Sequence, residues 1–153
     1  MPCPGTRPRV ASNPFLRGMD TAHVKYLGGL RTEAVHLRSG EKIITDAPVD
    51  NHGKGEAFSP TDLMSTSLAC CMMTLMGIAA NTHGIALNRL EARVVKHMAA
   101  NPRRVARVEL AFELDGSVLD PHQRAILERA ARTCPVAMSL NQDLVQDVTF
   151  TYT

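Results

Sequence analysis

Several features that would assign a function class are absent from this sequence of 153 residues. No apolar run reaches the roughly 18 residues of a membrane-spanning helix, because serines and threonines interrupt the most apolar stretch, residues 63–80. The first residues lack the apolar segment of a secretory signal. Internal repeats and the Cys-x-x-Cys spacing of zinc or thioredoxin-type sites are also missing. We therefore expect a cytoplasmic globular protein with no membrane partner and no metal.

The net charge of +2 comes from the first 18 residues. They contain three arginines, four prolines and no acid, a composition typical of a disordered tail. The rest of the chain has 14 Lys and Arg against 15 Asp and Glu, so we expect no basic surface and no nucleic-acid partner. The sequence predicts a disordered tail over residues 1–18 and a single domain over residues 19–153.

The hydrophobic pattern predicts strands in three parts of the chain. Short β-like runs within residues 22–46, separated by glycine turns, predict a meander of two or three strands. Residues 90–98 and 105–114 predict a hairpin, because apolar and charged side chains alternate along the second segment. Residues 144–152 predict a closing strand.

Capping residues predict the start of two helices. Ser59 and Pro60 suit an N-cap and a first helical position, and the helix should run to about Asn81. It is apolar on nearly every side, so we expect burial on several faces, by a sheet or by a second subunit. Asp120 and Pro121 open a second helix in the same way. The resulting order, β-β-α-β-β-α-β, predicts an α+β fold in which a strongly curved antiparallel sheet surrounds a buried central helix.

Two cysteines occupy core-facing positions on the two long helices. Cys71 lies in the middle of the first helix, and Cys134 ends the stripe Ile126–Ala130–Cys134 of the second. They are either packing residues or a redox pair, in which a thiolate attacks a peroxide oxygen and the sulfenic acid condenses with the second thiol. Cys70 lies about 100° around the helix from Cys71, and we interpret it as a packing residue.

The stretch from Phe58 to Leu75 resembles the family of osmotically inducible protein C and organic hydroperoxide resistance protein (the OsmC/Ohr family). That family has a proline at the helix start and a reactive cysteine eleven residues later, which is Cys71 here. Its second marker, Cys-Pro-Val in the later helix, is similar to Cys134-Pro135-Val136. Residues 29–34 and 45–56 resemble a less studied, OsmC-like branch of the same family.

This resemblance implies an enzyme of oxidative-stress defence, a peroxidase that forms an intertwined homodimer. Cys71 would attack organic hydroperoxides and Cys134 would close a disulfide with it. No bound cofactor is implied, and a lipoyl-type dithiol, on a lipoylated protein or another carrier, would be the reductant.

One position departs from the peroxidase branches. They have a glutamate directly after the proline, which holds an arginine over the thiolate, and Thr61 stands there in this chain. Glu56 is the candidate replacement for the carboxylate, and Arg31, Arg38 and Lys54 are candidates for the cation. The missing glutamate favours an alternative function: a non-catalytic binding protein with an apolar pocket at the dimer interface. The retained cysteine pair favours the peroxidase.

Overall fold

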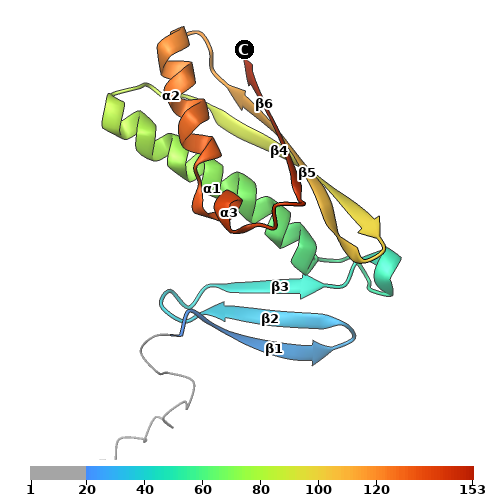
Figure 1. Ribbon diagram of the computed structural model, residues 1–153. Coiled ribbons are helices and arrows are strands. Elements are labelled where there is room, and N and C mark those ends of the chain that lie inside the picture. Colours follow the sequence, from blue (N-terminus) through green and yellow to red (C-terminus); the bar gives the residue numbers. More distant parts are fainter. Residues whose placement is uncertain (1–19) are drawn as a thin grey trace, which may run out of the picture. The chain divides into compact units, whose positions relative to one another are not determined.

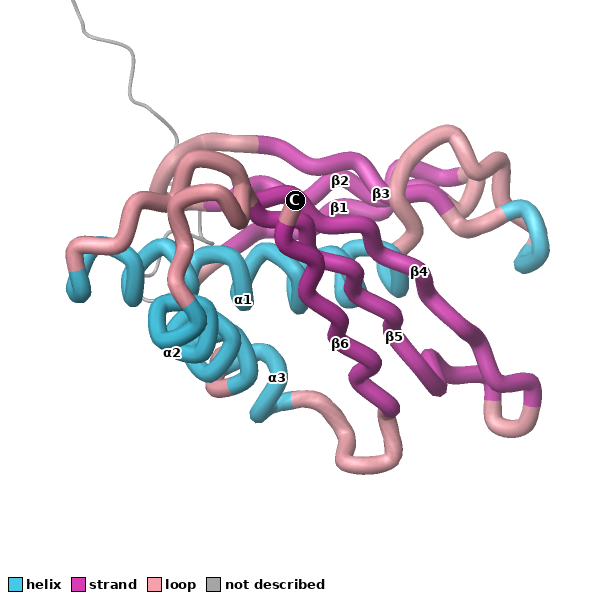
Figure 2. The backbone as a smooth tube through the Cα atoms, turned by 90° about the horizontal axis from the view of Figure 1, so that it is seen from above, coloured by secondary structure: helices cyan, strands magenta, loops and turns pink. Residues whose placement is uncertain are grey.

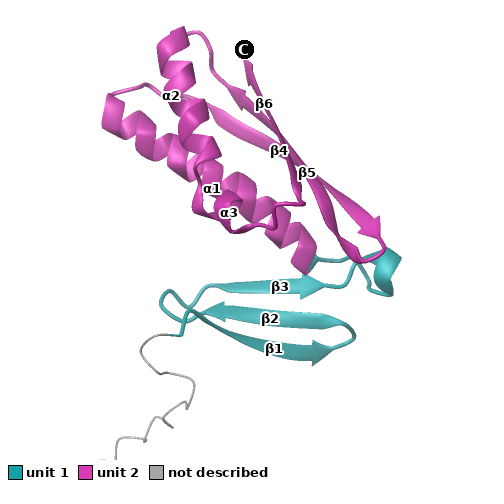
Figure 3. Ribbon diagram, viewed as in Figure 1, with its two compact units in different colours: residues 1–59 teal, residues 60–153 magenta. Residues whose placement is uncertain are grey.

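The computed structural model describes residues 20–153, an α+β chain that divides into two units at Ser59 (Figure 3). The predicted tail, residues 1–18, and Cys3 within it lie outside the described residues. The elements run in the order β1 (Ala22–Gly28), β2 (Arg31–His36), β3 (Lys42–Asp46), the 3-10 turn η1 (Val49–Asn51), α1 (Pro60–His83), β4 (Leu90–Ala100), β5 (Arg103–Leu114), α2 (Pro121–Arg132), α3 (Pro135–Ser139) and β6 (Val145–Tyr152) (Figure 1).

The first unit contains an antiparallel sheet in the order β1-β2-β3. Three strands therefore precede α1, within the predicted meander of two or three, and the predicted element order, which counted two, is corrected to three. The additional strand comes from the turn at Gly40, whose positive φ of 78° suits glycine and lets the chain reverse a second time.

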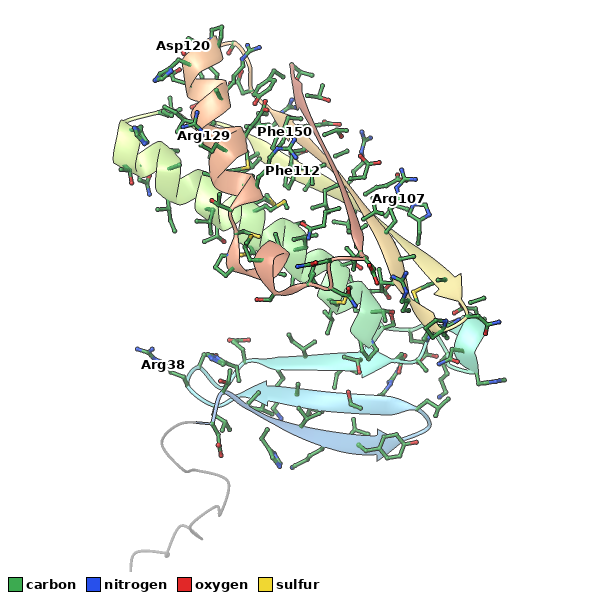
Figure 4. The ribbon with its side chains drawn as sticks, viewed as in Figure 1. Arg38, Arg107, Phe112, Asp120, Arg129 and Phe150 are labelled. Carbon is green, nitrogen blue, oxygen red and sulfur yellow. The ribbon has the colours of Figure 1, made fainter. Side chains whose placement is uncertain are left out.

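The second unit places its helices on one face of the sheet β4-β5-β6 (Figures 1 and 2). The hairpin of β4 and β5 confirms the prediction from alternating residues. The inward-facing residues of β5 are buried, and Phe112 stacks on Phe150 of β6 with ring centroids 5.3 Å apart (Figure 4). This layer of apolar side chains forms the core between sheet and helices.

The sheet of the second unit is mixed, which corrects the prediction of an antiparallel sheet. β6 pairs in parallel with β5, from Arg107 opposite Val145 to Leu114 opposite Tyr152. The physical reason is the connection: α2 and α3 carry the chain back to the start of β5, and a helical crossover joins parallel strands.

The long helix α1 has one buried face in the single chain. Its buried residues are Ser65, Leu68, Ala69, Met72, Met76 and Ala80. On the other side Ile78 is 55% exposed and Cys70 is also exposed, so the expected burial on several faces is not met within the second unit. By length and composition alone α1 is able to cross a membrane, contrary to our expectation, but core helices meet the same criterion and α1 packs against α2 and the sheet.

The second helix, α2, begins where the sequence predicts. The Gln123 backbone N–H donates to Asp120 Oδ1 at 2.8 Å, and the Gln123 side chain accepts from the Asp120 N–H at 3.1 Å. This reciprocal capping box satisfies two backbone donors at the start of the helix. Proline at position 135 then separates α2 from the short helix α3.

Candidate active site

The two cysteines of the predicted redox pair come together inside the second unit. Cys71 is partly buried on α1, packed against the core, and Cys134 is fully buried at the start of α3. The neighbouring Cys71 thiol contributes to a raised pKa of Cys134, and both thiols are free. A neighbouring pair of free thiols is the arrangement from which a disulfide can form on oxidation.

The two thiols differ in their surroundings. Burial raises the pKa of the Cys134 thiol above its ordinary value, and the adjacent Cys71 adds to this effect. The Ala137 N–H donates to Cys134 Sγ at 3.3 Å and opposes the rise, but burial is the larger effect. A thiol that keeps its proton is a poor nucleophile, so Cys134 is poorly suited to attack first.

Cys70 differs from the packing residue that the sequence predicts. It is exposed on α1, whereas the next residue, Cys71, packs against the core. The difference follows from the helix geometry, because successive residues point about 100° apart. In the single chain the Cys70 side chain is therefore exposed to solvent.

In the first unit, Arg31 is held by two carboxylates. Its Nε donates to Asp46 Oδ1 at 2.6 Å and its Nη2 to Asp46 Oδ2 at 2.7 Å, a two-pronged contact. The same Nη2 donates to Glu56 Oε2 at 2.8 Å. The Glu56 N–H donates to Asp46 Oδ2 at 3.0 Å, which ties the loop to the end of β3.

This cluster, Arg31, Asp46 and Glu56, keeps a fixed charge. Hydrogen bonding to Arg31 holds the pKa of Asp46 below its ordinary value although the carboxylate is only 2% exposed. Hydrogen bonding to Asp46 in turn raises the pKa of Arg31. The guanidinium is one-third exposed, so a charged, oriented group faces outward from a buried anchor.

The candidates for the thiolate-activating cation differ in their contacts. Arg31 and Glu56, both predicted from the sequence, lie in one cluster. Arg38 extends from the turn after β2 and has no ion pair within residues 20–153 (Figure 4). The sequence analysis did not consider Asp46. The turn at Gly40 could have indicated it, because pairing the residues on either side of that turn places Arg31 opposite Asp46 across β2 and β3.

The comparisons with known proteins agree with this architecture. The family model described as OsmC-like protein matches residues 53–148. The chain belongs to the OsmC-like family. A crystal structure from Psychrobacter arcticus 273-4, provisionally named an osmotic stress induced and detoxification response protein, is 50% identical with a TM-score of 0.83, covering 90% of this chain and 99% of that one. No curated protein sequence matches the chain at a significant level.

More distant OsmC-like structures share the fold. The organic hydroperoxide resistance protein OsmC from Legionella pneumophila has 18% identity and a TM-score of 0.66, over 88% of this chain and 99% of that one. OhrB of Bacillus subtilis, also an organic hydroperoxide resistance protein, has 16% identity and a TM-score of 0.57, over 86% and 98%. At these identities the likeness is one of fold.

In this OsmC-like chain, Thr61 stands at the position of the family's glutamate and takes part in a different interaction. The Lys96 ammonium of β4 donates to Thr61 Oγ1 at 2.9 Å and pairs with Asp62 Oδ1 at 2.7 Å. Asp62, in the first turn of α1, therefore ties this helix to the sheet. Among the described residues no group of three or more His, Cys, Asp or Glu side chains is arranged to hold a metal.

Proposed function

We propose that this OsmC-like protein is a thiol peroxidase for organic hydroperoxides. The Cys71 thiolate attacks the terminal peroxide oxygen, the O–O bond breaks, and the alcohol leaves once its alkoxide takes a proton. The sulfenic acid on Cys71 then condenses with the Cys134 thiol, which releases water and forms a disulfide. A lipoyl-type dithiol returns both cysteines to thiols and is itself oxidised to a disulfide.

The observation that supports this most directly is the neighbouring, unequal thiol pair. Cys71 is the less buried of the two and is reached more readily by a substrate. Cys134 is buried beside Cys71, and its pKa lies above the ordinary value of a cysteine thiol. This inequality favours Cys71 as the first nucleophile and Cys134 as the resolving thiol.

We also propose that Arg31 supplies the positive charge that favours the thiolate form of Cys71, in the same chain or from a second copy. A nearby cation stabilises a thiolate. Among the candidates, Arg31 is the one fixed by both Asp46 and Glu56, which suits a group that must keep one orientation. Asp46 and Glu56 would then take the part of the glutamate that Thr61 replaces.

Exposed apolar surface supports a homodimer. On one face of β1-β2-β3, Val24, Tyr26 and Ile43 are 60%, 66% and 50% exposed. The open side of α1 includes Ile78. Exposed apolar side chains gathered on one face of a sheet or helix are commonly covered by a partner, and a second copy is the partner we propose.

A thiol count tests the peroxidase. Reduced protein is treated with one equivalent of cumene hydroperoxide and its remaining thiols are counted. We expect two thiols per chain to be lost, with a Cys71–Cys134 link in the peptide map. Cys71→Ser should consume no hydroperoxide, and Cys134→Ser should stop at a sulfenic acid. Cys70→Ser is the matched control and should behave as the unmodified protein.

The outcomes separate the two functions. If Cys71→Ser consumed hydroperoxide as fast as the unmodified protein, Cys71 would not be the nucleophile. Absence of any hydroperoxide consumption by the unmodified protein, from pH 6 to about pH 9, would favour the binding protein with an apolar pocket at the dimer interface. Arg31→Gln should slow the reaction at neutral pH and less so in alkaline buffer, where thiolates form without help.

A further inference from the structure

A second candidate site lies in the second unit and is lined by neither cysteine. An open groove with a volume of about 420 Å³ runs between the C-terminal part of α1 and the length of α2. It is within the range of small-molecule sites in proteins. Its lining combines three basic side chains with small or apolar ones: His83, His122 and Arg129, together with Ala79, Ile126, Ala130 and Thr133.

The lining of the groove follows one side of each helix. Ala79 and His83 are four residues apart on α1, and His122, Ile126 and Ala130 are four apart on α2. Cys134 follows α2 in extended backbone, at the start of α3. Residues four apart share a face of a helix. Cys71 adjoins Cys134 while His83 and His122 line one groove, so the helices run in opposite directions with the thiols at one end.

Neither thiol lines the groove, although Thr133 at one end of it directly precedes Cys134. Ala79 is eight residues from Cys71, which is about 12 Å along the helix axis. From His122 to Thr133 the groove extends about 16 Å. The small side chains of Ala79 and Ala130 line the facing rows there, which leaves room for a linear ligand.

The chemistry of the lining indicates an anion. Arg129 is labelled on α2 in Figure 4, and helical side chains lean towards the N-terminus, in its case towards His122. Histidine donates N–H bonds in either protonation state and is charged when protonated. In the described part of the chain His83, His122 and Arg129 have no hydrogen bond or ion pair, so their donors are free for a ligand.

No acid lines the groove to compete for this charge. The carboxylate at the N-cap of α2 and the one within the helix have other partners. Asp120 accepts from the Gln123 N–H at the start of α2, and Glu128 accepts from the Tyr152 hydroxyl at 2.8 Å. The Thr133 hydroxyl donates to the Ala130 carbonyl at 3.0 Å. The far end of the groove thus offers little hydrogen bonding and an apolar floor.

We propose that this groove binds a linear monocarboxylate with an aliphatic chain. The carboxylate would accept hydrogen bonds from Arg129 and the two histidines. The chain would lie over Ile126 and between Ala79 and Ala130, directed towards Thr133. This proposal does not rest on the proposed peroxidase reaction, because no lining residue is a cysteine.

Calorimetric titration with decanoate at about pH 6, where histidine commonly carries charge, tests the proposal. We expect one site per chain. Arg129→Gln should weaken binding about tenfold, because it removes a charge-assisted contact. Ala130→Leu should weaken it at least as much by filling the groove. Arg132→Gln is the matched control: it changes the same residue type on the same helix, but Arg132 lies over the Phe150 ring and does not line the groove.

Two further ligands and one variant complete the design. Decanol and decyltrimethylammonium should bind at least about tenfold more weakly than decanoate, because neither presents an anion. Cys71→Ser should bind decanoate as tightly as the unmodified protein, which separates this site from the redox chemistry. Circular dichroism checks that each variant is folded. Should Ala130→Leu unfold, Arg129→Gln still tests the proposal, because Arg129 is exposed and its replacement leaves the core unchanged. Absence of decanoate binding, or equal affinity in Arg129→Gln and Arg132→Gln, would overturn the proposal.

Discussion

Oxidation of the thiol pair should stabilise the second unit. The perturbation is one equivalent of hydroperoxide, which is expected to link Cys71 to Cys134. The link closes a loop of 64 residues, counting both cysteines. It constrains the unfolded chain far more than the folded one, in which the two thiols already interact.

The size of the effect follows from the loop length. The chain-entropy relation gives about 4 kcal/mol for a loop of this length at 25 °C, and measured disulfides commonly contribute about 2–4 kcal/mol. For a protein of about 150 residues this corresponds to a rise in Tm of about 5–15 °C.

Scanning calorimetry of reduced and oxidised protein measures the shift. Cys70→Ser should keep the full rise in Tm, whereas Cys134→Ser should show none. A non-reducing gel separates a link within one chain from a link between two chains. An oxidised protein that has lost both thiols within one chain, yet melts at or below the Tm of the reduced form, would refute the reasoning.

Three other predictions follow from particular residues. Leu127→Ala removes a fully buried side chain of α2 and should lower the free energy of unfolding by about 2–5 kcal/mol in urea titrations; an effect below 1 kcal/mol would contradict the packing described. The raised pKa of Cys134 means that the folded chain keeps a proton which the unfolded chain loses above about pH 8.5, so the stability of reduced protein should fall as pH rises beyond that value. Cys134→Ala should lack this part of the fall, and identical pH profiles would count against it. Sedimentation at micromolar concentration should show a homodimer, and replacing the exposed Ile78 by Asp should shift it towards monomer; a monomer before substitution would remove the dimer proposal.

Local signals in the sequence were sufficient for much of the fold. The alternation along residues 105–114 predicted β5, because a strand with one buried face repeats every two residues. Asp120 and Pro121 predicted the start of α2, because capping depends on neighbouring residues only. The direction of β6 was missed. The helical connection before it was a usable signal for parallel pairing, but alternation by itself says nothing about direction.

The candidate site divides in a similar way. The spacing of eleven residues from Pro60, and Cys-Pro-Val at Cys134, singled out Cys71 and Cys134 by resemblance. Neither motif could show that burial raises the pKa of Cys134. Arg31 and Glu56 were among several candidates, and Asp46, their buried anchor, was not considered.

By itself the sequence determined the helices, most strands, the family and the two cysteines, because these depend on side chains close together in the chain or on a shared motif. The tertiary structure alone decided which thiol is buried, which arginine is held, and which face of α1 stays open. Each of these depends on residues distant in sequence that meet only after the strands and helices have packed. Burial raises the pKa of the Cys134 thiol, and the register of β2 and β3 places Arg31 opposite Asp46.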